Sequence, residues 1–233
     1  LCITGPTASG KSALAVRLAQ LLGGEVVSCD SMQIYRGMDI GTAKPTEAEM
    51  CGVPHHMIDI VAPSEDYNCG RYADEAAKVI KDIASRGALP IVCGGTGLYL
   101  DSLITATEHA DALSDPAMRE ELLARDAQSL HDELSEIDAE SAAAIHPNNK
   151  RRVARAIEIY RITGRTKSEW DRRSQDTPSP YDASVVALGY LDRELLYRRI
   201  RMRVDEMFDR GLCDEVCSLD LDPDSTAAAA IGY

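Results

Sequence analysis

The chain has 233 residues, of which 45% are hydrophobic and 27% are charged, and its formal net charge is −13. This length allows one large core, or a core with a small inserted domain. No run approaches the roughly 18 apolar residues of a membrane span and no signal-peptide pattern opens the chain, so we expect a cytoplasmic protein rather than a membrane-bound or secreted one. The chain starts inside an apolar segment without a Met, and we expect it to be part of a longer protein.

Strand and helix patterns alternate in the first third of the chain. Residues 1–4, 25–29 and 89–93 have the composition of buried strands. Apolar residues at helical spacing predict helices over residues 12–22 and about 71–86, each followed by glycine. This alternation predicts an α/β fold, a P-loop NTPase-like parallel sheet flanked by helices.

The pattern changes after about residue 107, where only short, charged helical stretches follow until about residue 173. Strand character returns at residues 184–191, and a long helix is predicted from about 193 to 210. We therefore predict a discontinuous catalytic core, residues 1–107 and 179–233, and a helical insertion domain, residues 108–178.

The charge within the predicted insertion is unevenly distributed. Residues 108–140 carry eleven acids and two bases, whereas residues 146–173 carry nine bases and three acids. A local basic face can bind phosphates even on an acidic protein, because salt screens charges beyond about 10 Å. The alternative is an ordinary solvated helix face.

The seven cysteines are widely spaced and include no C-x-x-C pair. Most lie in apolar contexts, so we predict buried thiols in a reducing cytosol. Cys213 and Cys217 have no other obvious metal ligands nearby. The side chains of His55 and His56 should point in different directions because the two residues are adjacent, so we interpret them as structural rather than as metal ligands.

Residues 5–12 (GPTASGKS) match the phosphate-binding loop G-x-x-x-x-G-K-[ST], placed after a buried strand and before a helix. Backbone N–H groups of such a loop surround an anion, while Lys11 adds a positive charge and Ser12 offers a hydroxyl to Mg²⁺. We therefore predict Mg²⁺ as cofactor and a diphosphate site made of Gly5, Pro6, Thr7, Ala8, Ser9, Gly10, Lys11 and Ser12. The loop alone does not identify the substrate, because kinases and other ATP-binding proteins share it.

Two further segments follow predicted strands and should face the same site, because parallel strands end at one edge of a sheet. Asp30 follows the second strand, and Gly94, Gly95 and Thr96 follow the strand at residues 89–93. A hydrolysing NTPase would normally carry an Asp in place of this Gly-Gly-Thr, so that class is disfavoured. Asp30 itself could be a metal ligand, a general base or a helix cap.

Taken in order, these motifs resemble the tRNA dimethylallyltransferases, also called tRNA isopentenyl transferases. The matching segments are residues 5–12, 30–35, 38–45, 54–59, 94–99, 146–148, 152–158 and 199–204. A sister group that prenylates free adenine nucleotides shares the fold and the P-loop, but Ser31 and residues 41–44 follow the tRNA-type pattern.

The resemblance implies transfer of a dimethylallyl group from dimethylallyl diphosphate to N6 of the adenosine 3′ of the tRNA anticodon. It implies a catalytic set of Thr7, Lys11, Asp30, Thr96 and Arg203. The implied tRNA contacts, which would hold the anticodon stem-loop, are Asp30, Ser31, Met32, Gln33, Thr96, Arg119, Arg151, Arg152, Val153, Ala154 and Arg155. The family continues into a basic C-terminal stretch, so we expect the core to be truncated here. We expect a monomer.

Three alternatives remain open from the sequence. One is the adenine-nucleotide prenyltransferase of the sister group. Another is a P-loop small-molecule kinase, whose lid arginines the basic stretch could imitate. The last is a nucleotide-gated RNA-binding module without catalysis.

Overall fold

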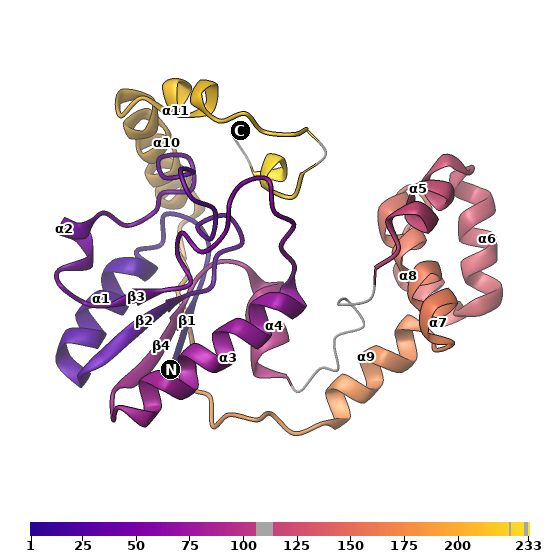
Figure 1. Cartoon of the computed structure of the whole chain (residues 1–233), viewed down its shortest axis with the longest axis horizontal. Coiled ribbons are helices and arrows are strands. Elements are labelled where there is room, and N and C mark those ends of the chain that lie inside the picture. Colours follow the sequence, from indigo (N-terminus) through magenta and orange to yellow (C-terminus); the bar gives the residue numbers. More distant parts are fainter. Residues whose placement is uncertain (106–113, 224, 231–232) are drawn as a thin grey trace. The chain divides into compact units, whose positions relative to one another are not determined.

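The computed structural model describes residues 1–105, 114–223, 225–230 and 233 (Figure 1). The chain divides into two compact units, Leu1–Leu103 with Tyr181–Tyr233 as unit 1, and Ile104–Pro180 as unit 2. The sequence placed the boundaries at 107/108 and 178/179, and the first of these lies outside the described residues. That the two units are separate functional domains stays a prediction.

Unit 1 contains a five-stranded sheet in the order β3-β2-β4-β1-β5, and every pairing is parallel. The strands are β1 (Cys2–Thr4), β2 (Gly24–Ser28), β3 (His55–His56), β4 (Leu89–Cys93) and β5 (Val185–Ala187). The predicted α/β fold with a parallel sheet is confirmed. The two-residue β3 was not predicted, because two residues are too short for a periodic pattern.

Helices cover both faces of this sheet (Figure 1). Helix α1 (Lys11–Leu22) packs Ala15, Val16 and Ala19 against Ile3 and Ile91 in one apolar cluster. Helix α3 (Cys69–Ser85) packs against β2 and β4, and the hydroxyl of its Tyr72 donates to the carbonyl of Ser28 at 3.0 Å. Because side chains alternate along a strand, helices on both faces of the sheet explain why β4 is a continuous apolar run and why Val26 and Val27, adjacent in β2, are both buried.

The remaining helices of unit 1 lie around the sheet. They are α2 (Glu47–Met50), α4 (Gly97–Ile104), α10 (Arg193–Asp209), α11 (Leu212–Ser218) and the short 3₁₀ helix η2 (Ala227–Ala229). Helix α10 agrees with the predicted helix, and Asp192 caps its N-terminus by accepting from the Glu194 amide. None of its residues is buried, so this helix is held by polar contacts and a partly covered face.

Unit 2 is helical throughout its described part. Its helices are α5 (Pro116–Ala124), α6 (Ala127–Ile137), α7 (Ala139–Ala144), α8 (Lys150–Thr163) and α9 (Lys167–Asp176). Each begins at a polar side chain that accepts a backbone N–H of the first turn, a favourable helix start. Leu122, Leu130, Leu134, Val153 and Ile157 form its apolar core.

The thiols only partly follow the prediction. Cys2, Cys29, Cys69 and Cys93 are buried, but Cys51, Cys213 and Cys217 are exposed. These three lie on or beside short surface helices, which leave one side of every turn in solvent. No helix in the described part of the chain has the length and apolar character that crossing a membrane requires.

Candidate active site

The site lies where the parallel strands end. Strand β1 leads into the P-loop, β2 into Cys29 and Asp30, and β4 into Gly94 and Gly95. The β2 and β4 ends approach so closely that a Cβ on Gly94 would lie 1.9 Å from the Cys29 carbonyl oxygen. Only glycine therefore permits this approach, which brings the segments after β2 and β4 to the P-loop.

The P-loop has an unusual backbone at its centre. Ala8 has a φ of 59°, a left-handed conformation that is unfavourable for a side chain with a Cβ. Its carbonyl accepts a hydrogen bond from Arg199 Nε at 2.9 Å and one from the Tyr190 hydroxyl at 3.3 Å. These two contacts hold the loop from the side of α10, and the sequence analysis missed both of them.

Three charged side chains meet at this loop. Arg203 donates to the Thr7 hydroxyl at 3.2 Å, and Lys11 donates to the Pro6 carbonyl at 2.7 Å. Burial lowers the pKa of Lys11, and the Arg203 charge lowers it further, while Cys93 and Asp30 raise it. Burial also lowers the pKa of Arg203, and the charge of Asp30 opposes that shift. Two cations and one carboxylate thus share a single electrostatic environment, as expected for a site that receives an anion.

Asp30 is held by the backbone that follows it. Its Oδ1 accepts the amides of Met32 at 3.0 Å and Gln33 at 3.4 Å, and Oδ2 makes neither bond. Thr96 fixes the same segment, because its hydroxyl accepts the Ser31 amide at 3.0 Å. Oδ1 of Asp30 therefore caps the turn that follows β2, and no helix begins there; the roles of metal ligand and general base stay open.

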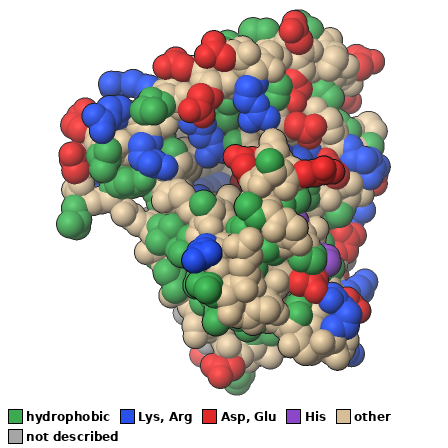
Figure 2. Space-filling view, turned by 90° about the vertical axis from the view of Figure 1, so that its left-hand side faces the viewer, with side chains coloured by type: hydrophobic (Ala, Val, Ile, Leu, Met, Phe, Trp, Pro, Cys, Tyr) green, Lys and Arg blue, Asp and Glu red, His purple; other side chains and the backbone are tan. Residues whose placement is uncertain are grey.

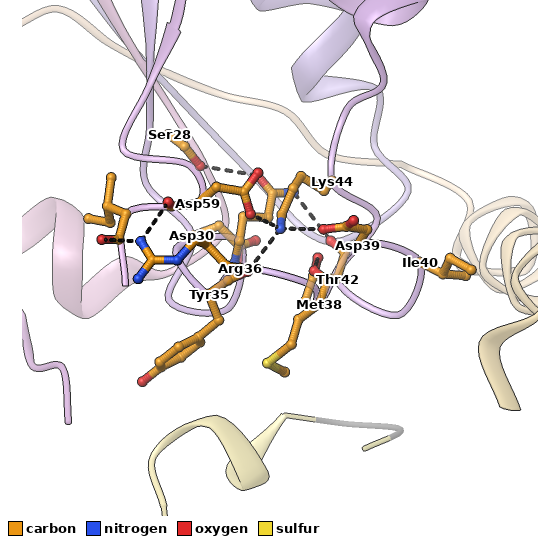
Figure 3. A network of polar contacts seen from close by, with 12 residues as sticks. Ser28, Asp30, Tyr35, Arg36, Met38, Asp39, Ile40, Thr42, Lys44 and Asp59 are labelled. Atoms are coloured by element: carbon orange, nitrogen blue, oxygen red, sulfur yellow. Dashed lines mark hydrogen bonds and ion pairs between the residues drawn. The ribbon is translucent and has the colours of Figure 1, made fainter. Parts of the chain in front are cut away.

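Both polar ends of the Gln33 side chain are hydrogen-bonded within the protein. Its Oε1 accepts the Ser28 hydroxyl at 3.1 Å, and its Nε2 donates to the carbonyls of Thr42 and Ala43, each at 3.2 Å. Figure 3 shows Ser28 and Thr42, which lie in this region together with Lys44. For the Gln33 side chain to hydrogen-bond the edge of a base, its hydrogen bonds to Ser28, Thr42 and Ala43 would first have to break.

A cleft of about 710 Å³ opens beside the P-loop. Its apolar lining includes Val16, Ile40, Leu195, Met202 and Met207. Its charged lining consists of two acids and six bases: Glu49, Glu206, Lys11, Lys44, Arg198, Arg199, Arg203 and Arg210. In Figure 2, basic and hydrophobic side chains gather beside a hollow in the upper part of the face shown. A cleft with both characters suits a ligand that combines an anionic group with an apolar one.

The site fits Mg²⁺ only as an ion shared with a bound diphosphate. In the described part of the chain, no three His, Cys, Asp or Glu side chains lie together as a metal-binding group. Mg²⁺ commonly takes few protein ligands and completes its shell with phosphate oxygens and water. The Ser12 hydroxyl, which lines the cleft, could supply one such ligand.

Ser9 adds a second sign that the loop is made for a ligand. Its Oγ is buried and has no hydrogen-bond partner among the described residues. A buried polar atom without a partner costs about 1–3 kcal/mol, and a phosphate oxygen close to the loop could accept from this hydroxyl.

In unit 2, the structure separates the predicted tRNA contacts into two groups. Arg119 and Arg155 both bind the carboxylate of Glu158, with contacts of 2.8 Å each, and Glu158 is 0% exposed. The Asp115 amide also donates to Glu158 at 2.8 Å. These two arginines therefore neutralise a buried acid, and they are not simply surface charges awaiting a phosphate.

The other four predicted contacts lie along the start of α8. Val153 and Ala154 are fully buried in the core of unit 2, so their side chains pack inside the unit, and a contact between these two residues and tRNA stays a prediction. Arg151 and Arg152 are exposed in the first helical turn. Positive charges are unfavourable at that end of a helix, because the backbone dipole is positive there. A bound anion would relieve this repulsion.

Comparison with known proteins bears directly on this site. Residues 33–233 match the IPP transferase family, and residues 1–62 match the isopentenyl transferase family. A tRNA dimethylallyltransferase of Halalkalibacterium halodurans is 49% identical over 240 residues, which covers 100% of this chain and 76% of the relative. A tRNA dimethylallyltransferase of Geobacillus thermodenitrificans is 50% identical over 238 residues, covering 99% and 75%.

The chain belongs to the IPP transferase family. Solved structures agree with this assignment. The full-length tRNA isopentenylpyrophosphate transferase of Bacillus halodurans has a TM-score of 0.68 at 46% identity, covering 100% of this chain and 74% of its own. A eukaryotic dimethylallyltransferase acting on tRNA has a TM-score of 0.82 at 35% identity, covering 96% and 57%.

Proposed function

We propose that this chain transfers a dimethylallyl group from dimethylallyl diphosphate to the N6 amine of the adenosine 3′ of the anticodon in tRNA. The observation that carries the proposal is the convergence of Lys11, Arg203 and Asp30 at the P-loop, in a chain of the IPP transferase family. The cations suit a leaving diphosphate, and the carboxylate suits an attacking amine.

The bond that breaks joins C1 of the prenyl group to the diphosphate oxygen, so negative charge increases on that oxygen in the transition state. Lys11 comes from α1 and Arg203 from α10, and each donates a hydrogen bond to the P-loop. Preorganised positive groups aimed at developing charge are the strongest contributors to such steps. Bound Mg²⁺, with Ser12 as a protein ligand, would supply further positive charge to the diphosphate.

The bond that forms joins the adenine N6 nitrogen to C1, and this nitrogen must lose a proton. Oδ2 of Asp30 is the acceptor in this proposal, since Oδ1 already accepts two amides. The amine becomes strongly acidic only as the C–N bond forms, so a positioned carboxylate can take its proton at that stage. Pyrophosphate and the N6-prenylated tRNA are the products, and the proton balance closes on Asp30.

The target adenosine has to leave its stack to reach this site. Contacts to the rest of the anticodon stem-loop are assigned to Arg151 and Arg152, which are exposed at the start of α8. In this proposal Ser31 and Met32, which are half-buried beside Asp30, line the path of the flipped base. Arg119 and Arg155 contribute to this surface only through the charge that Glu158 leaves uncompensated.

The decisive assay follows radiolabelled prenyl incorporation from dimethylallyl diphosphate, with Mg²⁺ and unmodified tRNA, and compares adenosine monophosphate and ATP as alternative substrates. We expect incorporation into tRNA and no consumption of ATP. Incorporation into the free nucleotide would favour the sister group, and ATP turnover without incorporation would favour a kinase. Binding of tRNA without any turnover would favour a non-catalytic module.

Asp30→Asn separates the base from the cap. Asparagine keeps an oxygen that can accept the Met32 and Gln33 amides, but it cannot take the proton. We expect kcat to fall by about 10²–10⁴, the usual contribution of a general base, with dimethylallyl diphosphate still bound. A rate within about threefold of the parent would mean that Asp30 is a cap alone.

A further inference from the structure

One wall of the cleft is a loop without regular structure, residues 38–45, which we call the cleft loop. Ile40, Ala43, Lys44 and Pro45 of this loop line the cleft opposite α10. Ala43 has a φ of 48°, so part of the loop holds an unfavourable backbone conformation. Such a conformation persists only where the surroundings fix it.

The inner side of the cleft loop is fixed by a buried ammonium group. Lys44 is 7% exposed, and its Nζ donates to the Tyr35 carbonyl at 2.9 Å. The same ammonium contacts the carboxylates of Asp39 and Asp59 (Figure 3). Lys44 therefore ties the end of the loop to Asp39 at its start, to the segment that follows β2 and to the segment that follows β3.

The outer side of the loop is fixed by one carboxylate from a distant part of the chain. Glu215, in the first turn of α11, accepts the amides of Asp39 at 3.0 Å, Ile40 at 2.8 and 2.9 Å, and Gly41 at 3.2 Å. The Tyr233 hydroxyl donates to the same carboxylate and accepts the Gly41 amide at 3.0 Å.

Burial and charge distinguish this contact from an ordinary surface hydrogen bond. Burial by itself would raise the pKa of Glu215, but the Tyr233 hydroxyl and the loop amides lower it by more, so the group stays ionised. Three successive amides converge on one anion, an arrangement that a neutral side chain cannot replace. Gly41 has no side chain at this contact, and a Cβ there would lie 2.4 Å from the Tyr233 ring.

The cleft loop is also connected to the catalytic carboxylate. Gln33 holds the Thr42 and Ala43 carbonyls through its side chain and donates its own amide to Asp30. The contacts thus run without a break from Glu215 to the loop, from the loop to Gln33, and from Gln33 to Asp30. Helix α11 has seven residues, and Leu212 is its buried residue. Its hydrogen bonds to the cleft loop come from the Glu215 carboxylate.

We propose that Glu215 is a positioning residue for prenyl transfer: its carboxylate holds the cleft loop in the shape that receives the prenyl diphosphate. This role rests on the proposed function, because the ligand of the cleft is taken to be the prenyl donor. Glu215 touches no reacting atom, and it acts through the backbone of residues 39–41.

The test is Glu215→Gln in the full-length protein, with Asp214→Asn as the matched control. Asp214 is the neighbouring acid in the same helical turn, so its change removes the same charge. Glutamine offers one acceptor but turns an NH₂ group toward amides that also donate. We expect the KM for dimethylallyl diphosphate to rise about tenfold, which corresponds to one lost charge-assisted hydrogen bond, and kcat to change less than about threefold.

Hydrogen exchange of the amides of residues 39–41 is measured in the same samples. We expect it to become at least about tenfold faster in the Glu215 variant, with the exchange of β1 and β4 unchanged. A lower kcat at unchanged KM would mean that fewer molecules are folded, and it would overturn the positioning role. Unchanged exchange and kinetics would overturn it too.

Tyr233→Phe provides a milder second variant. It removes one donor to Glu215 and leaves the three amides in place, so we expect a KM rise of about twofold to threefold. A larger effect than that of Glu215→Gln would transfer the role to Tyr233. If the parent enzyme incorporates no prenyl group, the proposed function fails instead, and the exchange experiment still reports on the loop.

Discussion

The arginines at the P-loop of unit 1 and those of the helical unit 2 are used in opposite ways. In unit 1, Arg199 and Arg203 contact the P-loop through the Ala8 carbonyl and the Thr7 hydroxyl, and neither forms an ion pair with a described residue. In unit 2, Arg119 and Arg155 both bind Glu158 inside the helical core. Arg125 and Arg161 of the same unit bind Glu133.

This difference shows why a count of basic residues is a poor guide to phosphate binding. A guanidinium that neutralises a buried carboxylate has little net charge to offer a ligand, whereas one that contacts only neutral oxygens keeps its full charge. The same residue type therefore stabilises the fold in unit 2 and is available for a diphosphate at the P-loop. Mutations at the P-loop arginines should therefore change catalysis, whereas mutations of the ion pair in unit 2 should change the free energy of unfolding.

The largest effect is expected from Arg203→Ala. Loss of this cation removes stabilisation of the leaving diphosphate, and we expect kcat to fall by about 10²–10³, the usual cost of one such group. Thermal unfolding should change little, because no residue of α10 is buried. Arg201→Ala, an exposed arginine of the same helix that does not line the cleft, is the control. Equal losses in both variants would contradict a specific role.

The sequence predicts those parts of the site that local motifs specify, but not the contacts between residues that are far apart in the chain. The P-loop, the strand ends and Asp30 follow from local motifs, and the structure places them together. The left-handed Ala8 and its two distant partners have no local signal, because Tyr190 and Arg199 lie more than 180 residues away in the chain. For the same reason the role of Glu215 could not be predicted.

The helical unit illustrates a different limit. Its helices and their polar starts follow from the sequence, but the helix phase of α8 decides which residues face inward. Val153 and Ala154 proved to be core, between exposed Arg152 and half-buried Arg155. Glu158 binds Arg119, which lies 39 residues away in the chain, and no periodic pattern predicts such a pair. The charge count therefore treated Arg152 and Arg155 alike, although Arg152 is exposed and Arg155 binds the buried Glu158.

Glu158→Gln tests the structural use of arginine in unit 2. It leaves two guanidinium groups beside a neutral amide, and we expect unfolding to become easier by about 3 kcal/mol, near the lower bound for breaking a buried ion pair. Thermal or urea unfolding measures this change. Glu140→Gln is the control, because its carboxylate is exposed and lies 3.8 Å from Arg172, so its effect should stay below about 1 kcal/mol.

The stabilisation from Glu158 should also depend on pH. Burial raises the pKa of this carboxyl, but hydrogen bonds from Arg155, the Asp115 amide and Arg119 lower it by more, so the net shift is downward from 4.5. The ionised form is therefore favoured by folding, and its contribution is complete above pH 4.5 and lost as the pH falls below it. The difference in unfolding free energy between parent and Glu158→Gln should shrink over that range. A difference that grew in acid would contradict the ion pair.

The smallest effect is expected from Arg152→Ala, which sharpens the comparison inside unit 2 itself. Arg152 lies three residues from Arg155 on α8, but it is exposed at the helix start, where a phosphate would relieve its repulsion with the helix dipole. We expect the KM for tRNA to rise about threefold to tenfold, with the KM for dimethylallyl diphosphate unchanged. The slope of log affinity against log salt should fall by about 0.7–0.9, one phosphate contact. Lys81→Ala, an exposed base of α3, should change neither quantity, and a loss of stability in place of the tRNA effect would place Arg152 with the structural arginines.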